Sequence, residues 1–398
     1  MKSKKISCLF AGFALLLSAC SSEMPNEPLS DNMQSGEQTQ TRLSFEQALE
    51  RGEQMYDNLF KDEMRTRGSK RQVESVECIV GSTRTRGANE GDTLFYVVNY
   101  ADMGGFLMVP TDSRLEPVYA MSDTGRLDFS DTVQNKGLKA FYSNAVASAS
   151  STLANLPSVV PGDPIVGPVD PYDPEPTPLK VDPLLSDYQQ KIGQGNPYNA
   201  YTKYVEGVHG LVGCPALAMQ QIMSYYKYPY RPNGTIIDWD KINSGNDDRN
   251  LAVILARIGV TINTSYGINE SGVEDPIQMV NGFRDMYDYD PGTEVKLTSQ
   301  LAAYQLTKGP VLVYTKKLDV NMNGHVWVID GYKRTSGASY LGATYYLHCI
   351  WGWYGHSNGY YLWDLEKFTR YPDGDIEFEP QYPVYMLRGL KPNYNFEI

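Results

Sequence analysis

The stretch from Pro157 to Pro183 limits how this chain folds more than any other feature, because it contains nine prolines. Proline lacks a backbone N–H and fixes its φ angle, so such a stretch stays extended and joins neither a helix nor the interior of a sheet. We therefore expect a linker over residues 157–183, between a smaller domain over residues 20–156 and a larger one over residues 184–398. A chain of 398 residues is also long enough to need two hydrophobic cores.

The first residues have the pattern of an export signal. Three lysines precede an apolar run over residues 6–17, which is too short to remain as a membrane-spanning helix. The run ends in Leu17-Ser18-Ala19-Cys20, which resembles the lipobox of bacterial lipoproteins. This resemblance implies a signal peptide over residues 1–19 and acylation of Cys20, so the exported protein would be a cell-envelope lipoprotein of the outer membrane or cell surface. An ordinary secretory leader that is cut nearby is the alternative.

Charge and cysteine content narrow the possible functions. The net charge of −12 would repel a phosphate backbone, so we expect no nucleic-acid partner. Of the five cysteines, Cys8 lies in the leader and Cys20 in the lipobox, which leaves Cys78, Cys214 and Cys349. This odd number does not indicate a disulfide framework, and it predicts at least one free thiol.

The part before the linker has the pattern of a small α+β domain behind a polar tether. Ser44 and Gln47 have the spacing of a capping box, and an apolar stripe follows them, so we expect a helix to begin there. Apolar segments between Gly, Asn and Asp clusters indicate strands over residues 73–80, 93–100 and 106–109, and a second helix is expected over residues 133–153.

The part after the linker changes from helices to strands along the chain. Helical spacing covers residues 215–226, 250–258 and 276–286. Strand-like segments separated by Gly and Asn then cover residues 311–314, 325–332, 345–351 and 360–363. We expect an α+β domain, with a helical half followed by an antiparallel β half.

Cys214 has the surroundings of a reactive thiol. It lies between Gly213, which permits a tight turn, and Pro215, which suits the first position of a helix. The unpaired N–H groups and the dipole at a helix N-terminus stabilise a thiolate and lower the pKa of the cysteine. A small buried residue at a helix start is the alternative interpretation of this cysteine.

A cysteine nucleophile needs a base, and the chain has four histidines: His209, His325, His348 and His356. His325 follows Gly324 and begins an apolar strand, which would hold an imidazole rigidly in place. The alternative interpretation is a hydrogen-bonded histidine in the core. His348 and Cys349 are strand neighbours that face opposite ways, so we expect a packing or hydrogen-bonding histidine and a buried cysteine. His209 and His356 are expected in loops.

Three blocks of sequence resemble the streptopain family of papain-like cysteine peptidases, and the resemblance covers the chain from about Leu184 onward. They are Gly213-Cys214 with Gln221-Ile222-Met223 and Tyr226-Lys227-Tyr228-Pro229, then Gly324-His325 to Gly331, then Trp351-Gly352-Trp353 with Asn358-Gly359-Tyr360. The resemblance implies a papain-like, two-lobed peptidase domain with Cys214 as nucleophile, His325 as general base and Trp351 as a supporting residue.

The earlier part is similar to the propeptide and inhibitor module of the same family. The similar residues are Phe95-Tyr96-Val97, Gly104-Gly105-Phe106, Asp112, Arg114 and Leu115. The resemblance implies a zymogen whose own propeptide, the domain over residues 20–156, folds beside the peptidase domain and blocks its cleft until it is cut away near the end of the linker.

Gln194 falls where the family has its oxyanion-hole glutamine, so its amide would bind the developing oxyanion together with the backbone N–H of Cys214. Two positions depart from the family: Ile350 stands where an asparagine usually precedes Trp351, and Tyr354 replaces an expected glycine. The missing asparagine leaves two possibilities, in which His325 is held by a backbone carbonyl, water and the Trp351 ring, or in which activity is weakened or lost.

The sequence therefore predicts a cysteine endopeptidase that hydrolyses protein or peptide substrates through an acyl-enzyme. No metal or organic cofactor is expected, because neither a His-Glu-x-x-His motif nor a paired-cysteine zinc spacing occurs. Two alternatives stay open. The chain could be a non-catalytic protein that binds peptides or inhibits another peptidase, or it could catalyse another acyl transfer with the same dyad.

Overall fold

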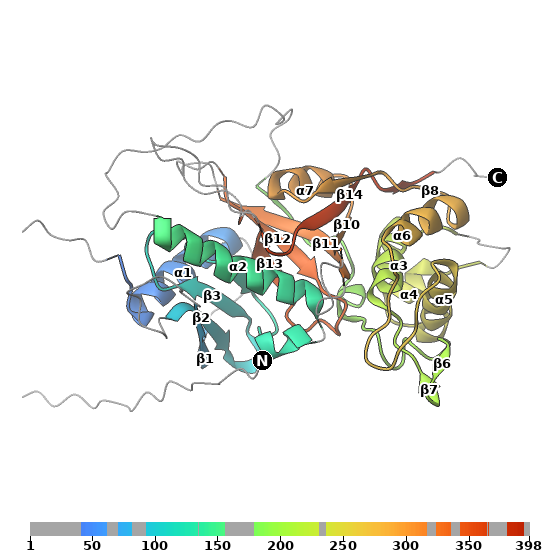
Figure 1. Ribbon diagram of the computed structural model, residues 1–398, viewed down its shortest axis with the longest axis horizontal. Coiled ribbons are helices and arrows are strands. Elements are labelled where there is room, and N and C mark those ends of the chain that lie inside the picture. Colours follow the sequence, from blue (N-terminus) through green and yellow to red (C-terminus); the bar gives the residue numbers. More distant parts are fainter. Residues whose placement is uncertain are drawn as a thin grey trace, which may run out of the picture.

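The computed structural model describes residues 41–61, 71–81, 93–133, 135–155, 179–230, 236–316, 324–335, 343–363, 365 and 380–393. The predicted signal peptide, Cys20 and most of the proline-rich linker lie outside these residues. We call residues 41–155 the N-terminal part and residues 179–393 the C-terminal part. In Figure 1 the N-terminal part lies at the left, and most helices of the C-terminal part lie at the right.

One antiparallel sheet runs through both parts of the molecule (Figure 1). Its strands, in spatial order, are β1 (Val73–Val80), β2 (Thr93–Tyr100), β3 (Phe106–Pro110), β4 (Ala120–Ser122), β13 (Gly359–Leu362), β12 (Tyr345–Ile350), β11 (His325–Arg334), β10 (Val311–Thr315), β14 (Val384–Arg388) and β9 (Thr293–Lys296). β4 joins the two parts by pairing with β13, with Met121 opposite Tyr360 and Ala120 opposite Tyr361. The proline-rich linker therefore separates the two parts along the chain but not within the sheet.

The N-terminal part also contains two long helices. α1 (Phe45–Phe60) begins at the predicted capping box, in which Ser44 and Gln47 each accept a backbone N–H of the other residue. α2 (Lys136–Asn155) begins three residues later than predicted, because the 3₁₀ turn η3 (Phe129–Val133) occupies the start of the expected helix. A second 3₁₀ turn, η2 (Ala101–Met103), connects β2 to β3.

The helical lobe of the C-terminal part is built around α3 (Cys214–Tyr226), whose side chains are almost all buried. The lobe also contains α4 (Trp239–Asn243), α5 (Asp248–Thr261), α6 (Ile277–Asn281) and the π-helical turn η6 (Gly282–Met286). α7 (Ser299–Leu306) packs instead against the sheet, in the core shared with the N-terminal part. The short elements are the 3₁₀ turn η4 (Gln189–Lys191) and the strands β5 (Lys180–Val181), β6 (Tyr204–Val205), β7 (Val208–His209), β8 (Tyr289–Asp290) and β15 (Lys391–Pro392). The predicted helix over residues 276–286 is thus divided into α6 and η6.

β5 fixes the start of the C-terminal part against the sheet. Val181 lies opposite Tyr332 of β11, although residues 180–181 fall inside the predicted linker. The N–H groups of Leu184 and Leu185 donate to the carbonyl and to the carboxylate of Asp330, at 2.9 and 3.0 Å. Residues 180–183, which were predicted to belong to the linker, therefore already lie against the sheet, before residue 184 where the peptidase-like domain was predicted to begin.

The two faces of the sheet bury separate hydrophobic cores. Along β11, Trp327 and Ile329 belong to the core shared with the N-terminal part, whereas Val326 and Val328 belong to the core shared with α3. Side chains alternate along a strand, so this division assigns each residue of β11 to one face. The assignment decides where the side chain of His325 lies.

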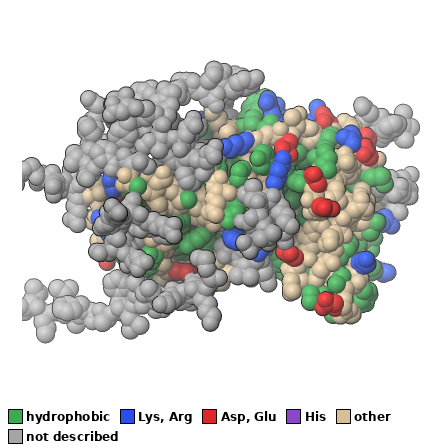
Figure 2. Space-filling model, viewed as in Figure 1, with side chains coloured by type: hydrophobic (Ala, Val, Ile, Leu, Met, Phe, Trp, Pro, Cys, Tyr) green, Lys and Arg blue, Asp and Glu red, His purple; other side chains and the backbone are tan. Residues whose placement is uncertain are grey.

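The described surface of the helical lobe mixes charged and apolar side chains, as Figure 2 shows at the right. Among the described residues of this lobe, the most exposed large hydrophobic residues are Val260, Tyr204 and Met286, at 72%, 65% and 60%. Within the described ranges, no helix has both the length and the apolar character needed to cross a bilayer.

Candidate active site

Cys214 is the first residue of α3, as predicted, and its thiol is nearly buried. Gly213 has φ +90°, which favours glycine, and Pro215 occupies the first turn. The side chain is only 8% exposed, and burial raises the pKa of the Cys214 thiol to about 12, although the N–H groups of Val326 and Cys214 oppose this shift. The prediction of a lowered thiol pKa is wrong for this form of the protein, because loss of water around the sulfur outweighs the helix terminus.

His325 is the first residue of β11, and its imidazole is buried and neutral. Its Nε2 lies 3.3 Å from the carbonyl oxygen of Trp351, and its backbone N–H donates to Thr315 Oγ1 at 3.1 Å. Burial lowers the pKa of His325 to about 4, the Trp351 carbonyl raises it, and the positive charge of Lys136 lowers it further. At neutral pH the ring therefore carries no charge.

The beginning of α2 lies directly against this histidine. A Cβ atom added at Gly137 would come within 2.7 Å of both His325 Cδ2 and Trp351 Cζ3. Asn135 fixes the start of the helix by accepting the N–H of Leu138 at 3.0 Å, and it is 1% exposed. The N-terminal part thus covers the His325 ring with backbone, at a position where only glycine fits.

His325 and Cys214 lie on adjacent elements, but their side chains belong to different faces of β11. The His325 ring stacks on Trp327, 6.1 Å between ring centroids, in the core shared with the N-terminal part. Cys214 belongs to the core on the α3 side, beside Val326. Among the described residues, no hydrogen bond joins the thiol to the imidazole, so the predicted nucleophile and base are close but not in a reacting arrangement.

Gln194 is buried in the loop before α3, where it is 3% exposed. Its carbonyl accepts the N–H of Val212 at 2.8 Å, two residues before Cys214. The loop is also tied to the Trp351 hairpin, because Asn358 accepts the Trp351 N–H at 3.1 Å and donates to the Gln190 carbonyl at 2.8 Å. The structure therefore brings Gln194, Cys214 and Trp351 into one connected region.

Ile350 does not face the His325 ring. It is fully buried in the core on the α3 side, opposite Val328 in the strand pair. In this form, the carbonyl of Trp351 is the hydrogen-bond partner of the imidazole, which agrees with the first of the two possibilities drawn from the missing asparagine.

The other histidines are accounted for by local contacts. His348 Nδ1 lies 2.6 Å from Asp330 Oδ1, so the predicted hydrogen-bonding role is confirmed, and Cys349 is fully buried as predicted. His209 lies in β7 rather than in a loop, with Nδ1 2.6 Å from the Thr202 carbonyl oxygen. His356 is exposed in the turn after Trp353.

Two residues that contact the candidate active site were not identified from the sequence as part of it. Gly137 gives no sequence signal, because its contact with His325 joins residues far apart along the chain. Tyr354 was noticed only as a departure from the family, yet its hydroxyl accepts the Gly195 N–H at 2.9 Å beside Gln194. The Gly-Gln-Gly spacing around Gln194 was the available signal, since it leaves room for a large neighbour.

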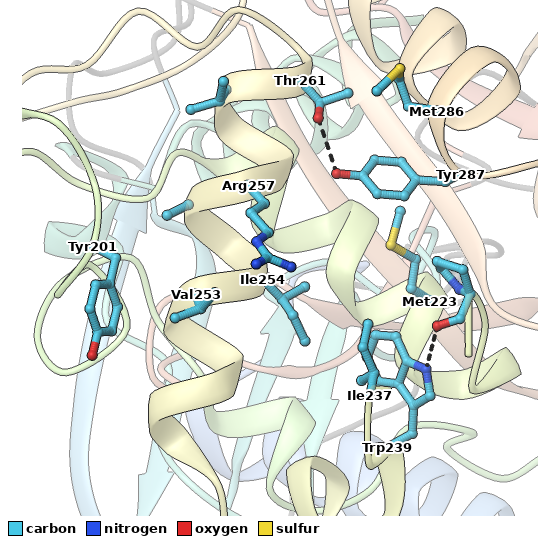
Figure 3. A pocket seen from close by; sticks show the side chains of 13 residues that line it. Tyr201, Met223, Ile237, Trp239, Val253, Ile254, Arg257, Thr261, Met286 and Tyr287 are labelled. Atoms are coloured by element: carbon cyan, nitrogen blue, oxygen red, sulfur yellow. Dashed lines mark hydrogen bonds between the residues drawn. The ribbon is translucent and has the colours of Figure 1, made fainter. Parts of the chain in front are cut away.

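A cavity of about 610 Å³ lies in the helical lobe, away from these residues (Figure 3). It lies between α5 and the segments that carry Trp239 and Tyr287, whose side chains bond the Pro229 carbonyl and the Thr261 hydroxyl. Met223, at the far end of α3 from Cys214, is its link to the nucleophile helix. None of the predicted site residues lines this cavity, so its size does not make it the catalytic cleft.

Comparison with known proteins matches both parts of the chain. Residues 192–361 match the model of the peptidase C10 family, and residues 44–148 match that of the Spi protease inhibitor. The chain is 24% identical over 331 residues to the thiol protease/hemagglutinin PrtT of Porphyromonas gingivalis, with 70% of this chain but only 35% of PrtT covered. It is 22% identical over 327 residues to streptopain of Streptococcus pyogenes serotype M1, with 68% of this chain and 73% of streptopain covered.

The fold is also similar to a solved structure of a prointerpain A fragment from Prevotella intermedia. The TM-score is 0.51 at 21% identity, and the match covers 77% of this chain and 98% of the fragment. This likeness confirms the predicted α+β fold, with a papain-like domain preceded by a propeptide region. The chain is a cysteine-type peptidase whose residues 192–361 match the peptidase C10 family, made as a zymogen in which a propeptide region similar to the Spi protease inhibitor comes first.

Proposed function

We propose that the protein is an exported endopeptidase in which Cys214 is the nucleophile and His325 the general base, and that the form described here is its latent precursor. The contact of Gly137 with His325 and Trp351 carries this proposal, because it places the N-terminal part directly on the predicted base. A buried, neutral dyad agrees with latency, since a thiol with a raised pKa is a poor nucleophile.

Withdrawal of α2 would expose the His325 ring to water and free it to turn toward the thiol. A carbonyl oxygen only accepts hydrogen bonds, so the Trp351 carbonyl selects the tautomer that carries its proton on Nε2. Nδ1 is then the unprotonated nitrogen, and it takes the proton of Cys214. The thiolate attacks the substrate carbonyl, while the Gln194 amide and the Cys214 N–H stabilise the oxyanion.

The protonated imidazole then gives its proton to the amine leaving group, and the peptide carbonyl stays bound to sulfur as a thioester. His325 next removes a proton from water, whose oxygen attacks the thioester and releases the carboxylic acid product and the thiol. Every proton that leaves one group is received by another, so the dyad is regenerated without a cofactor.

The test compares cleavage of unfolded casein by the parent chain, Cys214→Ala and Cys349→Ala. The first variant should lose both casein cleavage and self-processing, and the second should keep both, because Cys349 is fully buried and bonded to Trp363. If Cys214→Ala cleaves at the parent rate, the nucleophile is wrong. If the parent chain itself has no activity after removal of its N-terminal part, a peptide-binding protein is the better interpretation.

Anchoring through Cys20 is a separate part of the proposal, supported by the lipobox-like sequence Leu17 to Cys20. Metabolic labelling with an alkyne fatty acid should modify the parent chain but not Cys20→Ala. A parent chain that is exported without label would indicate an ordinary secretory leader.

A further inference from the structure

Tyr354 holds both sides of the loop that carries Gln194. Its backbone N–H donates to the Ile192 carbonyl at 3.2 Å, before Gln194. Its hydroxyl accepts the Gly195 N–H at 2.9 Å and donates to the Asn196 carbonyl at 3.4 Å, after Gln194. A single residue on the Trp351 hairpin therefore bonds the loop at three points around the glutamine.

The aromatic ring of Tyr354 lies flat on the same loop. A Cβ atom at Gly193 would come within 2.6 Å of three ring carbons, and a Cβ atom at Gly195 within 2.6 Å of the hydroxyl oxygen. Both neighbours of Gln194 are glycine at points where any side chain would push Tyr354 away. The Gly-Gln-Gly sequence is thus complementary to this tyrosine.

Packing alone does not account for Tyr354. Its φ angle is +56°, a left-handed conformation that costs energy for a residue with a Cβ. The side chain remains 40% exposed, so its burial offsets this cost only in part. Strained residues of this kind concentrate at functional sites.

The loop is coupled to the nucleophile as well. The Gln194 carbonyl accepts the N–H of Val212, which leads through Gly213 into Cys214. A shift of the loop would therefore move the glutamine amide relative to the Cys214 N–H, and both groups are the proposed oxyanion donors. Donors of this kind act only when they are already in place as charge develops.

We propose that Tyr354 is a positioning residue, which fixes the Gln194 amide for the oxyanion and so acts on turnover rather than on substrate binding. This inference rests on the proposed function. It assigns a role to one of the two positions that depart from the family pattern, since the tyrosine replaces a glycine and supplies a contact that glycine lacks.

The experiment measures kcat and KM on enzyme formed from the full-length chain by self-processing, with active sites counted by an irreversible peptide epoxide. Tyr354→Phe keeps the ring and removes the hydroxyl, and it should lower kcat about tenfold while KM changes less than about twofold. This loss is smaller than the 10²- to 10³-fold expected for removing an oxyanion donor itself. Tyr201→Phe is the matched control, because Tyr201 is 47% exposed and its hydroxyl accepts from Arg249 at 3.1 Å, outside the site.

A double-mutant cycle with Gln194→Ala distinguishes positioning from a general structural effect. If Tyr354 acts through Gln194, adding Tyr354→Phe to Gln194→Ala should lower kcat less than about twofold, because the positioned amide is already absent. Tyr354→Gly, which removes both ring and strain, should lower kcat at least as much as Tyr354→Phe without lowering the melting temperature.

Three results would overturn the inference: an unchanged kcat in both Tyr354 variants, a loss confined to KM, or an equal loss with and without Gln194. Each assumes that the parent activity depends on Cys214. If Cys214→Ala keeps the parent rate, the proposed function fails, whatever the Tyr354 variants do.

Discussion

Replacing Gly137 by alanine should open the latent precursor, because the new methyl group has no room. Its Cβ would lie 2.7 Å from atoms of the His325 and Trp351 rings, and both side chains are buried. Neither ring can move aside without disturbing the core around it, so the beginning of α2 must shift. Once α2 has withdrawn, the same methyl group is in water and causes no clash.

The size of the effect follows from the cost of overpacking. An extra methyl group in a filled core costs about 1–3 kcal/mol. The clash destabilises only the closed form, so the closed-to-open equilibrium should shift about 5- to 150-fold toward the open form, at 1.4 kcal/mol per factor of ten. Alanine also favours the helix over glycine by about 1 kcal/mol, but this gain is the same in both forms if α2 stays helical.

The assay is the initial rate of self-processing of the full-length chain at low concentration, with iodoacetamide labelling of Cys214 as a second readout. Both rates should rise within the stated range in Gly137→Ala. Gly52→Ala is the control, because its Cβ would lie 2.4 Å from Val109 Cγ1 inside the N-terminal part and far from the dyad. Equal acceleration by both variants, or a parent-like rate in a folded Gly137→Ala, would refute a specific contact on His325.

Two further predictions concern the same region. In a Cys214→Ala chain, where no thiolate can pair with the imidazole, the His325 pKa is about 4 in the closed form and near 6.5 when the ring is free. The open form then binds more protons below pH 6.5, and the closed form loses about 2 kcal/mol between pH 7 and pH 5. After this variant is cut at a protease site inserted in the linker, the N-terminal part should bind about 20-fold more weakly at pH 5 than at pH 7, and adding His325→Phe should abolish this pH dependence. A Cys214→Ala chain whose affinity is constant with pH would show that His325 stays neutral in both forms. Ile350→Asn should lower the free energy of unfolding by about 1–3 kcal/mol, because the new amide would be buried without a hydrogen-bond partner. An unchanged melting temperature would show that the amide has a hydrogen-bond partner in the folded protein.

Local patterns predicted most elements of the fold. The capping box at Ser44, the strands before residue 110 and the start of α3 at Cys214 all follow from residues within a few positions of one another. The joined sheet could not be predicted in this way. β4 is only three residues long, and its pairing with β13 connects positions about 240 residues apart, such as Met121 and Tyr360.

The residues of the candidate site were proposed from the sequence, but the arrangement in which the structure holds them was not predicted. Cys214, His325, Gln194 and Trp351 lie in one region, as the family resemblance implied. Their roles stay predictions until the variants are measured. What the sequence could not supply is the contact with Gly137, because nothing in a glycine's immediate neighbours shows which ring lies against it.

The pKa of Cys214 shows why that contact matters chemically. A helix N-terminus favours the thiolate, but its benefit is worth at most about 2 kcal/mol, whereas removing a charged group from water costs several. In the closed form Cys214 is 8% exposed and His325 3% exposed, so desolvation prevails and both groups are neutral. Withdrawal of α2 would admit water to the His325 ring and free it to turn toward Cys214, where thiolate and imidazolium would stabilise each other. In the proposed mechanism, the N-terminal part therefore suppresses the dyad by covering the His325 ring, which lies on the face of β11 away from Cys214.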